Sequence, residues 1–256
     1  MSEPDSLWLA AYVVIAFLTA GTVKGILGLG LPTVSLGFLG LALPPTQAAS
    51  LVIAAALVTN VWQFLAGPET LAVARRLAPM MLAMVLGVWF GVDFMIGAQQ
   101  AVVGMALGVL LIVYALLSLK RVVSRLPVRY EAGIGPAAGV LTGFLAGATG
   151  VMSMPGLAYL QAIGLERRLL VQALGLMFSV GTLALGALLW VNSSAWNALP
   201  RTTWLTLSVL ATIAGLVGMR IGQALEKRLS GLWFRRLFSA WLVVIGVAII
   251  WRNIGN

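Results

Sequence analysis

The sequence of 256 residues contains no cysteine and no histidine, and only 9% of its residues are charged. The absence of cysteine and histidine excludes disulfide bonds, thiolate chemistry, the usual zinc sites and a histidine proton relay. Soluble domains carry about 25% charged residues, whereas this chain combines its low charge with 61% hydrophobic residues. The composition therefore predicts an integral membrane protein. We interpret the net charge of +9 as loop charge, not as a nucleic-acid-binding surface.

Catalysis is disfavoured by the same absences. The chain has no paired carboxylates at a useful spacing and no phosphate-binding loop, and a serine without a neighbouring base is not a nucleophile. We expect no enzymatic activity, no cofactor and no metal. The first six residues are acidic and lack the basic region of a signal peptide, so we expect no cleavage.

Two long stretches are almost free of charge. The stretch from Leu7 to Leu65 carries only Lys24, and the stretch from Ala132 to Leu165 carries no charge. Both are too long for one membrane crossing, which takes roughly 20 residues. Each is interrupted by glycine and proline, as Gly-Ile-Leu-Gly-Leu-Gly-Leu-Pro at 25–32 and Gly-Ala-Thr-Gly-Val-Met-Ser-Met-Pro at 147–155. Paired breaks of this kind in two halves of a chain are typical of a transporter's binding site.

The loop charges distinguish two topologies. If each broken stretch is one bent crossing, eight spans result, and lysine and arginine divide eight to seven between the two sides. If each broken stretch is a hairpin that enters and leaves on one side, the division becomes thirteen to two, with Lys24 embedded. The positive-inside rule favours the hairpins. The thirteen are Arg75 and Arg76, the basic residues from Lys120 to Arg129, Arg167 and Arg168, and those from Arg220 to Arg236.

The hairpin topology predicts an all-α polytopic membrane protein that forms one transmembrane domain over residues 1–256. Two five-segment halves, about 7–119 and 132–251, flank a cytoplasmic linker at 120–131 and form an inverted repeat. Each half opens with a glycine/proline-broken re-entrant helical hairpin. Short matches support the repeat, although chance matching in an apolar background would also produce them. The matches are Gly25-x-x-Gly28 with Gly147-x-x-Gly150, Pro32 with Pro155, and Gln47-Ala48 with Gln172-Ala173.

The hairpins also suggest a binding site. The segments Pro32–Leu43 and Pro155–Leu165 would form about 18 Å of helix, too short for a hydrocarbon core about 30 Å thick. We therefore expect re-entrant tips inside the protein, with helix N-termini that attract anions. Two such N-termini could hold a small oxyanion between them. The alternative is that the glycines only allow close helix packing.

The polar residues of the apolar segments are few, and several have two interpretations. Lys24 could neutralise an anion or extend to the cytoplasmic interface, and Gln47 and Gln172 could bind substrate or connect helices. Asn60, Gln63, Ser179 and Thr182 could line a pathway, and Ser153 lies within the second break. We interpret Asp93 as an interfacial residue in preference to a coupling site. The candidate substrate-binding residues are Lys24, Gly28, Gly30, Pro32, Gln47, Asn60, Gly147, Gly150, Ser153, Pro155, Gln172 and Ser179.

The pattern Gly-x-x-Gly-x-Gly at 25–30, its degenerate copy at 147–150 and the two halves resemble the sulfite exporter (TauE/SafE) family. The resemblance implies a permease of the bacterial cytoplasmic membrane that exports sulfite or an organosulfonate such as sulfoacetate. The chain departs from the family where glycines are usual. It has Gly30-Leu31-Pro32 in the first break and Met152-Ser153-Met154 in the second.

The resulting hypothesis is export of a small sulfur-containing anion by alternating access. A permease for another small organic anion and a non-transporting membrane scaffold or accessory subunit are the alternatives. The expected partners are the anion and the lipid bilayer, without nucleic acid. The sequence leaves the oligomeric state open, a homodimer included.

We predict that Glu3 and Asp5 face the periplasm, while the Lys120–Glu131 and Arg220–Arg236 segments face the cytoplasm. Because the chain has no native cysteine, single cysteines at Ser2, Ser124 and Ser230 can be labelled with an impermeant reagent. Ser124 and Ser230 should react from one side and Ser2 from the other. Reaction of Ser124 and Ser230 from opposite sides would contradict the hairpin topology.

Overall fold

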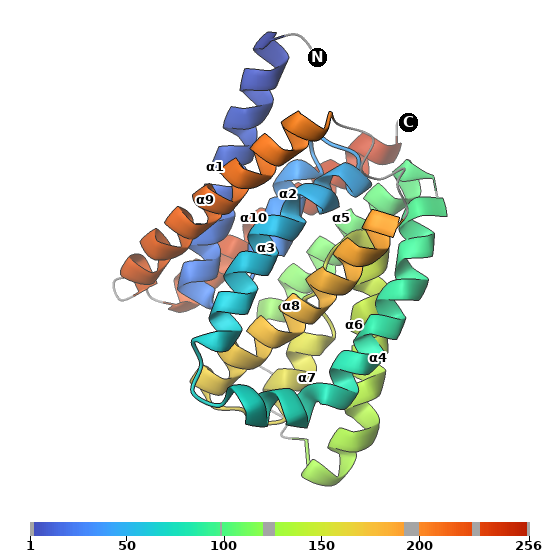
Figure 1. The fold of residues 1–256 in the computed structure, drawn as a ribbon, viewed down its shortest axis with the longest axis vertical. Helices are drawn as coiled ribbons and strands as arrows, with labels where there is room; N and C mark the ends of the chain where they lie inside the picture. Colours follow the sequence, from blue (N-terminus) through green and yellow to red (C-terminus); the bar gives the residue numbers. More distant parts are fainter. Residues whose placement is uncertain (1–2, 98, 120–125, 192–199, 227–230, 255–256) are drawn as a thin grey trace.

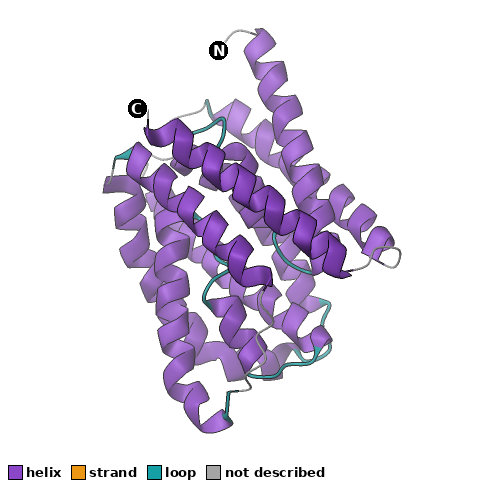
Figure 2. Ribbon diagram, turned by 180° about the vertical axis from the view of Figure 1, so that it is seen from behind, coloured by secondary structure: helices purple, strands orange, loops and turns teal. Residues whose placement is uncertain are grey.

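The structure, a computed structural model, describes residues 3–97, 99–119, 126–191, 200–226 and 231–254. Within these ranges the chain is helical and has no strand (Figures 1 and 2), which confirms the predicted all-α class. Part of the predicted linker, 120–125, and the labelling sites Ser2, Ser124 and Ser230 lie outside the described residues. The helices are α1 (Glu3–Leu27), α2 (Leu31–Leu39), α3 (Pro45–Leu65), α4 (Thr70–Gly97), α5 (Gln100–Leu119), η1 (Val128–Tyr130), α6 (Glu131–Thr149), α7 (Gly156–Ala162), α8 (Arg167–Val191), α9 (Arg201–Glu226) and α10 (Gly231–Ile254).

The outer surface of the helices is apolar. Leu82 and Phe90 on α4 and Val244 on α10 are 71%, 67% and 67% exposed, respectively. Soluble proteins rarely expose large contiguous apolar surfaces, so lipid is the natural surrounding of these side chains. Among the described residues, seven helices are long and apolar enough to cross a membrane, and α5 carries a shorter apolar stretch at 101–117. The chain is therefore a multi-pass membrane protein.

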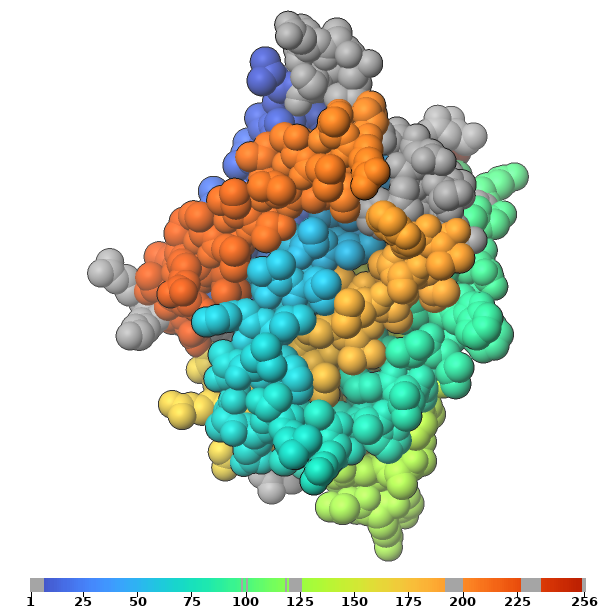
Figure 3. Space-filling model, in the orientation of Figure 1, coloured from blue at the N-terminus to red at the C-terminus, as the bar shows by residue number. Residues whose placement is uncertain are grey.

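The same helix pairs result when the first half of the chain is exchanged with the second half. If α1–α5 are exchanged with α6–α10, the pair α1–α9 becomes α6–α4, and both pairs pack extensively. The pairs α3–α8 and α5–α10 map onto themselves, and both also pack. Figure 3 shows α9, α3, α8 and α4 side by side across one face of the molecule. The pairing is compatible with the exchange of the two halves, and the inverted repeat itself stays a prediction.

Glycines allow the α4–α6 and α1–α9 pairs to approach backbone to backbone. A Cβ atom at Gly143 of α6 would lie 2.0 Å from the carbonyl oxygen of Met84 on α4, and one at Gly147 would lie 2.4 Å from that of Val88. In the other pair, a Cβ atom at Gly25 would lie 2.3 Å from the carbonyl oxygen of Met219. The first glycine of each matched motif, Gly25 or Gly147, therefore serves helix packing.

The second glycine of each motif ends a helix. Gly28 follows α1 with φ of 76°, and Gly150 follows α6 with φ of 79°, and both values are in the left-handed region that favours glycine. Gly30, with φ of 107°, precedes α2. The chain therefore breaks where the sequence predicts, and Pro32 lies in the first turn of α2.

The returning helices are shorter than the sequence suggests. α2 has nine residues and α7 has seven, whereas the first helix of each hairpin has 25 or 19. A helix of 25 residues is about 37 Å long, so α1 exceeds the roughly 30 Å thickness of a hydrocarbon core. The apolar residues at 41–43 predict a longer helix, but Gly40 ends α2 and the chain then turns toward Pro45.

Contacts near helix ends bring basic residues of α4 and α8 to one side of the described chain. Arg76 of α4 forms an ion pair of 2.7 Å with Glu131 at the start of α6. The backbone N–H of Leu126 donates to the carbonyl of Ala162 at the end of α7 (2.8 Å). Arg167 at the start of α8 pairs with Glu226 at the end of α9. These contacts lie near the starts of α4, α6 and α8 and at the ends of α7 and α9, and we name this side the arginine-rich face.

We predict that Gly143→Ala lowers the thermal stability of the protein, because the added methyl group would contact the Met84 carbonyl and separate α4 from α6. Overpacking of this kind costs about 1–3 kcal/mol. Thermal unfolding in detergent, followed by circular dichroism, measures the effect. Gly133→Ala is the control, because a Cβ atom there meets nothing within 4 Å. Equal unfolding temperatures for both variants would refute backbone contact at Gly143.

Candidate anion-binding site

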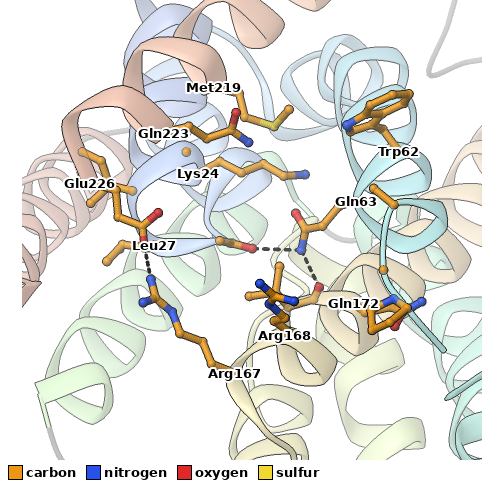
Figure 4. Close-up of a pocket in the computed structure, with 17 residues that line it drawn as sticks. Lys24, Leu27, Trp62, Gln63, Arg167, Arg168, Gln172, Met219, Gln223 and Glu226 are labelled. Carbon is orange, nitrogen blue, oxygen red and sulfur yellow. Dashed lines mark hydrogen bonds and ion pairs between the residues drawn. The ribbon is translucent and has the colours of Figure 1, made fainter. Parts of the chain in front are cut away.

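A pocket of about 610 Å³ lies where the end of α1 meets the end of α3, the start of α8 and the end of α9. Figure 4 shows side chains from these four helices pointing toward it. The apolar part of the lining includes Leu27, Trp62 and Met219, and the polar part includes Lys24, Gln63 and Gln223. Arg167 and Arg168 line its rim and are exposed. The pocket therefore opens on the arginine-rich face.

Lys24 lies at the buried end of the pocket and is only 2% exposed. Its ammonium donates hydrogen bonds to Thr59 Oγ1 (3.0 Å) and to Asn60 Oδ1, both on α3. No carboxylate among the described residues forms an ion pair with it. A buried charge without an opposite charge is costly, so an anion that enters the pocket is stabilised there. Lys24 thus points inward and does not extend to the interface.

The two partners of Lys24 are themselves buried. Thr59 donates its own hydroxyl to the Ala55 carbonyl (2.8 Å), which leaves the hydroxyl oxygen to accept from Lys24. Asn60 is 0% exposed, and its Nδ2 has no hydrogen-bond partner among the described residues. Buried amide donors are usually satisfied. The unbonded Nδ2 of Asn60 and the Lys24 ammonium are therefore close to each other. Both are hydrogen-bond donors that an anion could satisfy.

The rim adds further positive charge. Arg167 forms an ion pair with Glu226, so these two side chains contribute no net charge to the pocket. Arg168 lines the same rim and forms no ion pair with a carboxylate of the described residues. The lining therefore has three cationic side chains and one anionic side chain. A concave site with an excess of one sign of charge attracts counter-ions from solution.

Two glutamines build the wall between α3 and α8 and do not present free amides. Gln63 Nε2 donates to the carbonyls of Gly28 (3.0 Å) and Val171 (2.6 Å), which ties the first break to α8 (Figure 4). Gln172 Nε2 donates to the Phe64 carbonyl (3.0 Å), and its Oε1 accepts from the Glu69 N–H (3.2 Å). Gln172 therefore connects helices, which was one of its two predicted roles.

The remaining predicted residues divide between the pocket and other places. Gly28 and Gln172 line the pocket, and Asn60 contacts it through Lys24. Gln47 lies in the first turn of α3, about 24 Å along that helix from Gln63. Ser179 donates to the Gly175 carbonyl of its own helix (2.7 Å). Gly30 and Pro155 cap α2 and α7, and Gly147 contacts α4.

The void found where the two hairpins meet is very small. Near the second break, Pro32, Gly150 and Met152 line a void of only about 10 Å³, and Ser153 forms a hydrogen bond of 2.9 Å with Thr33. The expected arrangement of two helix N-termini around one anion is therefore absent from the described residues. The Thr33–Ser153 contact and Leu36, which lies against Gly150, are found near the second break instead.

Sequence reasoning missed the rim. Arg167 and Arg168 were interpreted as loop residues, and Trp62, Met219 and Gln223 were not considered. One available signal was the position of the two arginines directly after the second hairpin, at the start of a span. No feature of the sequence indicates that α9 lines the pocket, since this depends on the packing of α9 on α1.

Comparison with known proteins decides the family. The family model described as sulfite exporter TauE/SafE matches residues 13–249. The chain belongs to the TauE/SafE family. Members of this family are anion-exporting membrane permeases and not enzymes. A search of curated proteins and a search of solved structures each give no match. In this TauE/SafE member, the matched region includes all the residues that line the pocket.

We predict that Asn60→Asp abolishes anion binding in this TauE/SafE protein while preserving its fold. The new carboxylate would be nearly isosteric and would pair with Lys24, so the ammonium would no longer need an external anion. Sulfite binding to purified protein, measured by calorimetry, tests the effect. Ser179→Ala is the matched control, since its hydroxyl bonds within its own helix. Unchanged affinity in Asn60→Asp would show that Lys24 does not bind the anion.

Proposed function

We propose that this protein exports a small sulfur-containing anion, sulfite or an organosulfonate such as sulfoacetate, through the cytoplasmic membrane of a bacterium. The single observation that carries the proposal is the unpaired, buried ammonium of Lys24 at the inner end of an open pocket. Family membership supports anion export in general. The sulfonate group matches the pocket because its charge is spread over oxygens that accept from Lys24 and Asn60.

The size of the pocket is compatible with both substrate types. Its volume of about 610 Å³ is room for about twenty waters at 30 Å³ each. An inorganic oxyanion would enter with part of its hydration, and an organosulfonate would place its carbon atoms against the apolar lining of Leu27, Trp62 and Met219. The substrate would approach from the arginine-rich face, which we expect to be cytoplasmic.

The driving force follows from the charge of the substrate. Moving one elementary charge through a potential of 100 mV changes its free energy by about 2.3 kcal/mol. An anion therefore leaves a cell with a negative interior downhill, without a second ion. Asp93, the one acid inside an apolar segment, is exposed near the end of α4, which supports an interfacial role and gives no buried carboxylate for proton coupling in that helix.

The state of the pocket supports alternating access. The pocket is open on the arginine-rich face, whereas the void lined by Pro32, Gly150 and Met152 has a volume of only about 10 Å³. A conformation of this kind can load an anion from one side without a continuous pore. Release on the other side then requires a second conformation.

We predict that purified protein in liposomes carries sulfite at a rate that rises with the membrane potential and needs no proton gradient. Lys24→Gln should reduce anion affinity strongly, by 10-fold or more, if about 1.4 kcal/mol or more of the binding free energy is lost. Flux is followed in vesicles with a potassium diffusion potential. Arg201→Gln is the charge-matched control, because Arg201 is exposed at the start of α9 and does not line the pocket.

The alternatives give different results in the same assay. Flux of small carboxylates with no flux of sulfite or sulfonates would indicate a permease for another organic anion. Absence of flux for every anion would support a scaffold or accessory subunit. Flux that follows a pH gradient and ignores the potential would contradict the uncoupled mechanism.

A further inference from the structure

The two hairpins touch at one polar point deep in the protein. Thr33, in the first turn of α2, and Ser153, within the second break, are joined by a hydrogen bond of 2.9 Å between their hydroxyl oxygens. Each residue is 1% exposed. Thr33 lies three residues after Gly30 and Ser153 three residues after Gly150, so each hydroxyl follows a left-handed glycine. The contact joins the break of one half to the break of the other.

The surroundings of this contact are closed. The void beside it, about 10 Å³, is roughly the size of one water-sized probe. Leu36 of the first hairpin lies over Gly150, where a Cβ atom would be 2.8 Å from its Cδ1. Met152 is held against α8, since its sulfur accepts a hydrogen bond from Thr182 (3.7 Å). An anion in the 610 Å³ pocket cannot pass through this packing.

Breaking the contact leaves neither hydroxyl without a partner. Serine and threonine in membrane helices can donate to carbonyls one turn earlier in their own helix. Ser35, two residues after Thr33, already does this with the Leu31 carbonyl (2.6 Å). Thr33, in contrast, lies in the first turn of α2, and the Gly30 carbonyl before it already accepts from the Val34 N–H (2.8 Å). The hydroxyls of Thr33 and Ser153 therefore bind water when the region opens. Because water can replace the bond between the two hydroxyls, opening the contact loses only the small net free energy of one hydrogen bond.

We propose that the Thr33–Ser153 contact is the gate on the side opposite the arginine-rich face, which must open for the anion to leave. The proposal rests on the proposed transport function and adds the location of the barrier. In the present conformation the gate is closed while the Lys24 pocket is open. Separation of α2 from the second break would open the void lined by Ile53 and Thr182 to the opposite face.

The first test is a cross-link in a chain that has no other cysteine. In Thr33→Cys/Ser153→Cys, oxidation should form a disulfide, block sulfite flux in liposomes and leave sulfite binding to the Lys24 pocket intact. Reduction should restore flux. Each single-cysteine variant, treated with the same oxidant, should keep the flux of its reduced form. Failure of the disulfide to form, or full flux in the cross-linked protein, would overturn the gate.

The second test needs no transport. A cysteine at Ile53, which lines the void, should react slowly with an impermeant thiol reagent added on the face opposite the arginine-rich face. Adding Ser153→Ala or Thr33→Val should raise the labelling rate about fivefold, the effect of one net hydrogen bond on a two-state equilibrium. Ser35→Ala removes a hydroxyl from the same helix without touching the second hairpin, so it should not change the rate.

The two tests separate the two proposals. An unchanged labelling rate in both gate variants, or an equal increase in Ser35→Ala, would overturn the gate even if the protein transports sulfite. Absence of sulfite flux in the reduced double-cysteine variant and in the unmodified protein would contradict the transport function. In that case, the labelling of Ile53→Cys still decides whether the hairpins separate at Thr33 and Ser153.

Discussion

The rest of the structure depends on backbone-to-backbone contact between α1 and α9 and between α4 and α6. Glycines in these pairs leave no room for a side chain: a Cβ atom at Gly222 would lie 2.1 Å from the Thr22 carbonyl oxygen, and one at Gly91 2.1 Å from the Phe144 carbonyl oxygen. In lipid, where apolar side chains gain little from leaving their surroundings, such close packing is a main source of helix association. The paired helices then fix where each hairpin starts, and therefore where each break lies.

The fold was largely predictable, because it follows from charge and apolar length. The embedded Lys24, the thirteen-to-two charge division and the positions of Gly28 and Gly150 are local properties of the sequence, and the structure has the breaks at these residues. The lengths of α2 and α7 were not predictable from hydropathy. Apolar residues continue through 40–43 and 163–165, but Gly40 and Gly164 end the regular helix.

The candidate site was predictable only in part, for a physical reason. Lys24 and Asn60 stand out in a sequence because polar groups in apolar segments are costly, and the structure joins them. Glutamine offers no such signal, since an amide that binds a ligand and one that binds a neighbouring carbonyl look the same in sequence. Arg168 reads as an ordinary interfacial residue, and only the meeting of α8 with α1 and α9 places it at a rim.

The glutamine wall has a consequence for the evolution of substrate preference. Gln63 and Gln172 connect α3 to α8 through the carbonyls of Val171 and Phe64, and Gln63 also donates to the Gly28 carbonyl after α1. Every residue type has a backbone carbonyl, so these hydrogen bonds do not depend on which side chain the accepting residue carries. The side chain of Val171 can therefore change size or polarity without loosening the connection that holds this wall. The framework of the pocket and the identity of one lining side chain are in this way largely independent, which allows new anions to be accommodated by single substitutions.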